Sequence, residues 1–244
     1  MTMADGCLNF DTNINSEGFE KGLKSLSDMV GDIKPKLKSL AMAVTAAFSV
    51  KKLVDFGRQS IETASDLAEV QNVVDTAFGE SKQKMEDFAD TAVKTYGISK
   101  LTAKQTGSNF MAMAAGMGLD NDSASDMAMA LTGLSADMAS FYNVGQDVAS
   151  TALKSIFTGE TETLKQFGIV MTDANLQAYA LSKGITKSTA DMSQAEKVQL
   201  RYNYVMSQTA LAQGDFAKTS DSWANQTRIL SEQWKEFGAT IGTV

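Results

Sequence analysis

Two glutamates near the middle of the chain come closest to a catalytic arrangement. Glu160 and Glu162 lie in the segment GETETLKQFG, residues 159–168. Paired carboxylates can act as general acid and base when their surroundings separate their pKa values and a third group positions them. Neighbouring carboxylates at a helix start more commonly interact with its free backbone N–H groups and the positive end of its dipole. With no partner group nearby in the sequence, we interpret both glutamates as helix-start residues.

The rest of the chain offers little that could perform chemistry. It has no histidine and a single cysteine, Cys7, which excludes Ser-His-Asp and Cys-His mechanisms, the common zinc sites and an intramolecular disulfide. The run Asp120–Asp126 is similar to the start of a calcium loop, but Ser125 replaces its glycine and Leu131 its bidentate glutamate. No phosphate-binding loop or dinucleotide fingerprint is present. We therefore predict no enzyme activity, no catalytic residue, no cofactor and no metal.

Composition predicts an all-α protein. The 244 residues include one proline and 14 methionines, and 43% of them are hydrophobic, enough for one sizeable core or two smaller ones. The net charge of −7 argues against nucleic-acid binding, which needs clustered lysine and arginine. We expect no signal peptide and no transmembrane segment, because the uncharged run 39–50 is too short to cross a bilayer.

The glycines at both ends of the GETETL segment suggest a short turn and helix. Gly159 can adopt a positive φ angle and end the preceding helix, and Thr161 is the expected N-cap of the next one. Gly168 can close that helix about two turns later, with Phe167 directed into the core. We single out Gly159, Glu160, Glu162, Phe167 and Gly168 as a structural motif.

Four regions can be distinguished along the chain. Residues 1–35 form an arm, with a short strand predicted from the alternation over 8–14 and a helix after it. Residues 36–79 form one long amphipathic helix whose apolar stripe is expected to self-associate. Residues 80–213 form a compact helical body, and 214–244 begin a further long helix.

Within the body, local signals place the helix boundaries. Ser123 is the expected N-cap of a helix. The apolar stripe of this helix that we expect to be buried consists of Met127, Leu131, Leu134, Met138 and Phe141. Ser193 and Glu196 match a capping box. The C-terminal run carries an apolar stripe that is still continuing near its end, so we expect the chain to be part of a longer protein. This run contains both tryptophans, Trp223 and Trp234, and we expect them to pack in the core.

Several motifs, in a fixed order, together resemble one protein family. They are EVQNVVDTAFGES (69–81), LTGLSADMASFYN (131–143), GETETLKQFGI (159–169), EKVQLRYNYVMSQT (196–209) and GDFAKTSDSWANQTRIL (214–230). This series resembles the N-terminal region of phage tail tape-measure proteins over roughly residues 60–240. Thr163 departs from the family pattern, in which many members carry proline.

The resemblance implies a structural role in virion assembly. A tape-measure protein sets tail length by templating polymerisation of the tail tube, occupies the tube lumen in several copies, and leaves before the DNA. Expected partners are the tail tube protein, tail assembly chaperones, the tail tip complex and further copies of the chain. The expected location is the host cytoplasm and then the tail lumen. Two alternatives are a self-associating helical scaffold or signalling protein and the non-catalytic part of a cell-wall hydrolase.

Overall fold

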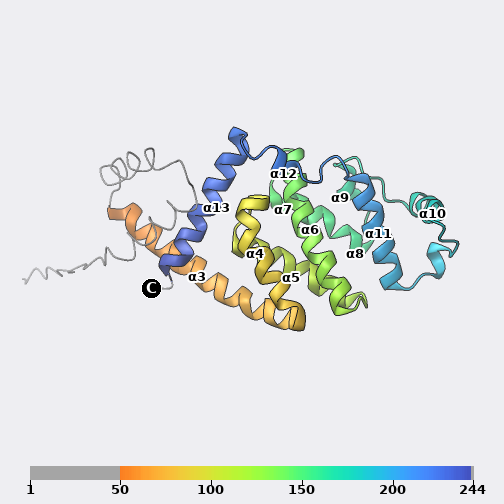
Figure 1. Cartoon of the computed structure of the whole chain (residues 1–244), viewed down its shortest axis with the longest axis horizontal. Helices are drawn as coiled ribbons and strands as arrows, with labels where there is room; N and C mark the ends of the chain where they lie inside the picture. The colour runs from red at the N-terminus through yellow and green to blue at the C-terminus, as the bar shows by residue number, and fades with distance from the viewer. Residues whose placement is uncertain (1–49, 243–244) are drawn as a thin grey trace, which may run out of the picture.

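The computed structural model describes residues 50–242, and every regular element within them is helical (Figure 1). The all-α prediction is thus confirmed for this part of the chain. The predicted arm of residues 1–35, with its strand, lies outside the described residues, as do residues 36–49 of the predicted long helix.

The helices follow one another in an elongated arrangement (Figure 1). At one end α3 (Val50–Phe78) packs against the last helix, α13 (Trp223–Gly242). The middle holds α4 (Lys82–Tyr96), α5 (Lys100–Gly116) and α6 (Asn121–Phe141). The remaining elements are the 3-10 turns η2 (Gly79–Ser81) and η3 (Thr189–Asp191) and the helices α7 (Gln146–Leu153), α8 (Ser155–Thr158), α9 (Glu162–Lys165), α10 (Asp173–Ser182), α11 (Gln194–Gln208) and α12 (Asp215–Lys218).

Helix α6 is the centre of the body. Every residue from Leu131 to Ala139 is buried, and α4, α5, α7 and α12 all contact this helix. Small side chains allow that close approach: a Cβ added at Gly133 would lie 2.9 Å from the ring of Tyr96. Long-range aromatic packing completes the core, as in the stacked rings of Phe110 and Phe157, whose centroids are 6.1 Å apart.

The core also extends across the boundary predicted at residue 79. Val74 and Phe78, in the last turns of α3, are fully buried with the residues of the body. Beyond them Gly79 has a φ angle of +53° and leads into η2. Helix α3 therefore contributes to the body at its C-terminal end and packs against α13.

Several helix boundaries follow their predicted local signals. The capping box is confirmed, with Ser193 Oγ accepting from the Glu196 N–H and the Glu196 carboxylate accepting from the Ser193 N–H. The predicted Ser123 cap is wrong, because Asp120 occupies the N-cap and its carboxylate accepts from the Ser123 N–H at 2.9 Å. The helix thus begins one turn earlier than expected.

The prediction that Phe141 belongs to the core is also wrong. Its side chain is 44% exposed, whereas the other four members of the stripe are buried. Phe141 is the last residue of α6, and the next residue, Tyr142, takes the inward position. The Tyr142 ring packs edge-on against buried Phe167, with centroids 5.0 Å apart, and the Phe141 ring packs edge-on against Tyr142.

Core packing of the two tryptophans is likewise not observed. Trp223 is 87% exposed and Trp234 is 45% exposed, whereas Phe237 on the same helix is buried. Where α13 meets α5, the Glu232 and Glu236 carboxylates accept hydrogen bonds from the backbone N–H groups at the start of α5. These bonds satisfy donors that a helix N-terminus leaves free, and they add to the packing of α13 against α3.

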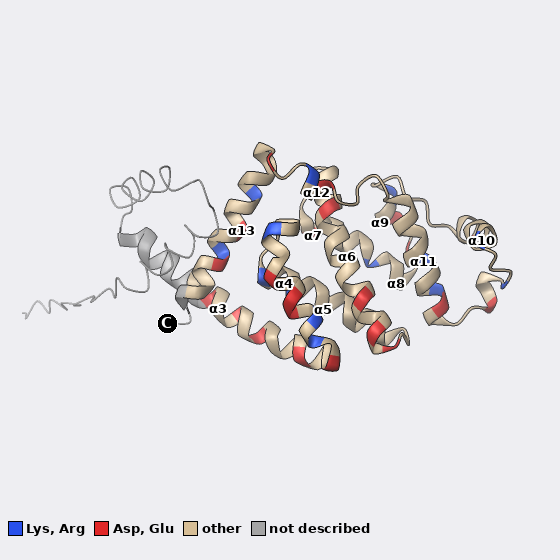
Figure 2. Ribbon diagram, viewed as in Figure 1, with Lys and Arg blue, Asp and Glu red and all other residues tan. Residues whose placement is uncertain are grey.

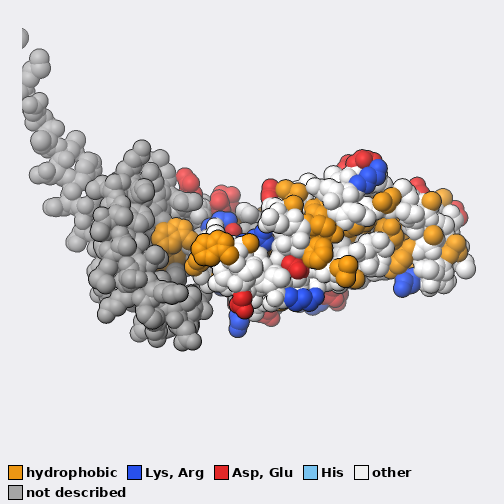
Figure 3. Space-filling view, turned by 90° about the horizontal axis from the view of Figure 1, so that it is seen from above, with side chains coloured by type: hydrophobic (Ala, Val, Ile, Leu, Met, Phe, Trp, Pro, Cys, Tyr) orange, Lys and Arg blue, Asp and Glu red, His pale blue; other side chains and the backbone are white. Residues whose placement is uncertain are grey.

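Charged and apolar side chains both contribute to the surface of the described residues. Figure 2 shows acidic residues along α3 to α6 with basic residues between them. On the face shown in Figure 3, exposed apolar side chains gather in more than one place. Within residues 50–242, no helix combines the length and the apolar character needed to cross a membrane.

Candidate functional site

The predicted structural motif forms a turn bounded by two glycines. Gly159 ends α8 with a φ angle of +79°, and its N–H donates to the Ser155 carbonyl at 2.8 Å. Gly168 has a φ angle of +75° and follows α9. Both angles lie in the left-handed region that glycine adopts without steric cost. The two glycines therefore have the backbone roles expected from the sequence.

Buried side chains hold this turn against the body. Leu164 and Phe167 are buried, and the Tyr142 hydroxyl donates to the Phe167 carbonyl at 3.0 Å. The hydroxyls of Ser155 and Thr163 hydrogen-bond to each other across the turn. Thr163, which departs from the family pattern, thus links the turn to α8 through its side chain.

The side chains of Glu160 and Glu162 do not form a catalytic acid–base pair. Glu160 is exposed, and the Glu162 carboxylate forms an ion pair with Lys165 at 2.6 Å. The hydrogen bond from Lys165 lowers the pKa of Glu162, which is the opposite of what a general acid needs near neutral pH. The expected side-chain cap is also absent, because Thr161 makes no capping hydrogen bond to α9.

An arginine from α11 completes the site, and sequence reasoning did not single it out. Arg201 Nη1 donates to the carbonyls of Ile156 and Phe157 at 3.4 and 3.3 Å, and these carbonyls belong to the C-terminal end of α8. A cation is favoured at this end of a helix, where carbonyl groups lack partners. A Cβ added at Gly159 would lie 2.6 Å from Nη2 of Arg201. Glycine is therefore favoured at 159 by its φ angle, and a Cβ there would also have to displace the end of the Arg201 side chain.

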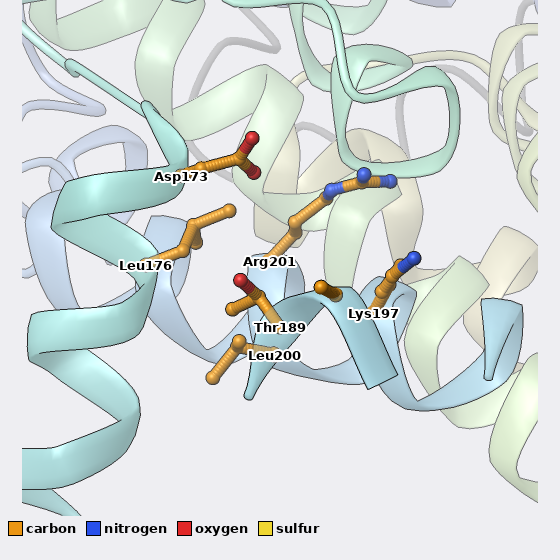
Figure 4. Close-up of a pocket in the computed structure, with 7 residues that line it drawn as sticks. Asp173, Leu176, Thr189, Lys197, Leu200 and Arg201 are labelled. Carbon is orange, nitrogen blue, oxygen red and sulfur yellow. The ribbon is translucent and has the colours of Figure 1, made fainter. Parts of the chain in front are cut away.

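Arg201 also lines a pocket of about 240 Å³ between α10, η3 and α11 (Figure 4). Its other lining residues are Asp173, Leu176, Thr189, Ala190, Lys197 and Leu200. Burial lowers the pKa of Arg201, and the negative charge of Asp173 acts in the opposite direction. The pocket thus combines two cations, one carboxylate and a smaller apolar part of the lining, which suits binding better than proton transfer.

Metal binding has no comparable arrangement in the described part of the chain. Residues 50–242 contain no group of three or more acidic, cysteine or histidine side chains placed to hold an ion. The run that is similar to a calcium loop supplies the Asp120 cap instead, and Lys84 forms ion pairs with Asp122 at 3.3 Å and Asp126 at 3.0 Å. These carboxylates have structural roles.

Four of the five sequence motifs make contact with one another in the folded chain. Asp137 of segment 131–143 accepts from the N–H groups of Gly214 and Phe216 at 2.7 and 3.2 Å. The same segment meets 159–169 through Tyr142, and segment 196–209 meets the Gly159 turn through Arg201. No protein-family model, curated protein or solved structure matches the chain.

Proposed function

We propose that this chain is the N-terminal part of a phage tail tape-measure protein. The supporting observation is that four of the five motifs carrying the family resemblance contact one another in the helical body, through Asp137, Tyr142 and Arg201. Because these contacts depend on particular side chains, a series of motifs in one order supports a shared arrangement of helices more strongly than a single motif would.

Turns at the ends of two of these motifs explain why particular residue types matter there. Asn143, at the end of the ASFYN motif, has a φ angle of +53°, which asparagine tolerates better than most side chains. Gly214 opens the GDFAKTS motif with a φ angle of +72°, and Phe216 beside it is fully buried. A Cβ added at Gly97 would lie 2.3 Å from the Phe216 ring, so this contact admits little variation.

In the proposed role the described residues form a packed head, and a further helical region acts as the ruler. The protein assembles in the host cytoplasm with tail assembly chaperones, the tail tip complex and further copies of itself. It then lies in the lumen formed by the tail tube protein and has no catalytic role.

Deletions in the phage or prophage that encodes the chain test this function. An in-frame deletion in the helical region beyond the head should shorten tails uniformly, by about 1.5 Å per residue removed. A deletion within residues 131–172 should abolish tails, because it removes the central helix and the Gly159 turn. Electron microscopy of purified particles measures both results. Tails of unchanged length after the first deletion would refute the ruler function.

One observation favours the alternative of a self-associating helical scaffold. Trp223 is 87% exposed and Leu230 is 55% exposed on the same helix, α13, and exposed apolar side chains of this size suit association. Light scattering of the purified chain distinguishes the two functions when it is combined with the deletions: a scaffold would self-associate, and its gene would have no effect on tail length.

A further inference from the structure

The pocket between α10, η3 and α11 contains two cations without an ionic partner. Lys197 and Arg201 are four residues apart on α11 and both line it (Figure 4). Among the ion pairs found within the described residues, none involves either side chain. Asp173 is the one acidic residue that lines the pocket, so the lining carries an excess of positive charge in a chain whose net charge is −7.

The contacts of Arg201 with α8 use only part of its hydrogen-bonding capacity. Nη1 donates to the Ile156 and Phe157 carbonyls, while a guanidinium carries five N–H donors in a planar fork that matches a carboxylate. These backbone contacts hold the side chain in place beside the pocket. A cation that is partly desolvated and fixed in position contributes more binding free energy toward an incoming anion than a freely moving surface cation does.

The walls of the pocket define the rest of the ligand. Leu176 and Leu200 are each 4% exposed and form an apolar part of the lining, and Thr189 adds a hydroxyl group. Asp173 places a negative charge near Arg201, which disfavours a ligand with a second anionic group. The lining therefore suits one anionic group attached to a short apolar stem.

We propose that this pocket binds a single carboxylate on a short apolar stem. Lys197 and Arg201 provide the counter-charges, Leu176 and Leu200 contact the stem, and Asp173 selects against dicarboxylates. A glutamate side chain of a protein partner and a free short-chain carboxylic acid share this chemistry. The proposal depends on the pocket alone and is independent of the tape-measure function.

Nuclear magnetic resonance titration of the 244-residue chain at constant ionic strength tests the proposal. The probes are N-acetylglutamate N-methylamide, butyrate, glutarate as the dicarboxylate, and uncharged N-acetylglutamine N-methylamide. We expect the two monocarboxylates to bind with a dissociation constant on the order of 1 mM, typical of a small ligand. Chemical shift changes should be confined to residues 173–176 and 189–201, and glutarate and the uncharged amide should bind several times more weakly.

Variants of the charged residues identify the groups responsible. Lys197→Gln should weaken binding roughly tenfold, as expected for loss of a charge-assisted hydrogen bond. Asp173→Asn should strengthen glutarate binding more than butyrate binding. Lys94→Gln, which changes an exposed lysine on α4, is the matched control and should have no effect.

The comparison of probes also separates the two sources of the carboxylate. Tighter binding of the capped glutamate than of butyrate would indicate a protein partner, and the reverse order a free acid. Shift changes spread over many surface lysines, equal binding of the uncharged amide, or identical affinities of Lys197→Gln and Lys94→Gln would each overturn the proposal.

Discussion

Replacing Gly159 by alanine should destabilise the chain more than the same change at Gly168. Both glycines have φ angles near +80°, where alanine costs about 1 to 2 kcal/mol. At Gly168 an added Cβ meets nothing within 4 Å, so this strain is the whole cost. At Gly159 the Cβ would lie 2.6 Å from Nη2 of Arg201 and would displace the guanidinium.

The additional cost at Gly159 can be calculated from the contacts that Arg201 would lose. Both of its hydrogen bonds to backbone carbonyls come from Nη1 and are long, at 3.3 and 3.4 Å. We therefore count the two together as one charged hydrogen bond at the lower end of the usual range, a loss of about 1.5 kcal/mol in stability. Gly159→Ala should therefore cost about 3 kcal/mol and Gly168→Ala about 1.5 kcal/mol. In a chain of this size the difference corresponds to about 3 to 6 °C in the melting temperature.

Urea unfolding of both variants measures these free energies, with an unchanged slope as the control for a common unfolded state. A third variant, Arg201→Met, retains the apolar stem but removes the guanidinium. In that background, Gly159→Ala should cost only the strain term, giving a coupling energy of about 1.5 kcal/mol. Equal destabilisation by the two alanines in the parent chain would refute the role assigned to Arg201.

Two further predictions concern the core and the titration of a capping residue. Phe157→Ala should cost about 3 to 5 kcal/mol because the ring is buried, whereas Phe141→Ala should cost only about 1 kcal/mol; equal costs in urea unfolding would contradict the observed packing. Glu196 accepts hydrogen bonds from Lys187 and from the Ser193 N–H, which lower its pKa from 4.5 to about 2. Its stabilising contribution should therefore be complete above pH 4.5 and disappear as the pH falls to about 2. Carboxyl titration by nuclear magnetic resonance checks this, and Lys187→Gln should raise the midpoint; an unchanged midpoint would exclude Lys187 as the cause.

Local signals predicted the features that depend on neighbouring residues. The capping-box residues Ser193 and Glu196 are three positions apart, and the positive φ angle of Gly159 follows from its place after a helix, so both could be recognised from the sequence. The Ser123 error was also local in origin. Asp120 lies three residues before Ser123, and both are good N-cap residues, so pattern alone did not separate them.

Features that depend on distant contacts could not be predicted in the same way. Arg201 reaches carbonyls 44 and 45 residues earlier in the chain, and no local pattern indicates that pairing. The periodicity of α13 showed that its apolar residues share a face but not which face meets the body. The packing of α13 against α3 and the hydrogen bonds from the start of α5 to Glu232 and Glu236 together set that orientation, with Trp223 outside the core.

Those same hydrogen bonds have a consequence for the order in which the chain folds. The Ser99 N–H and its acceptor, Glu232, are 133 residues apart, and Lys100 and Glu236 are 136 residues apart. At a synthesis rate of about 5 to 20 residues per second, the start of α5 waits roughly 7 to 27 s for its acceptors. During that interval its terminal N–H groups can be satisfied only by the Ser99 cap and by water. The nascent chain therefore gains its last long-range contacts only when α13 has been synthesised.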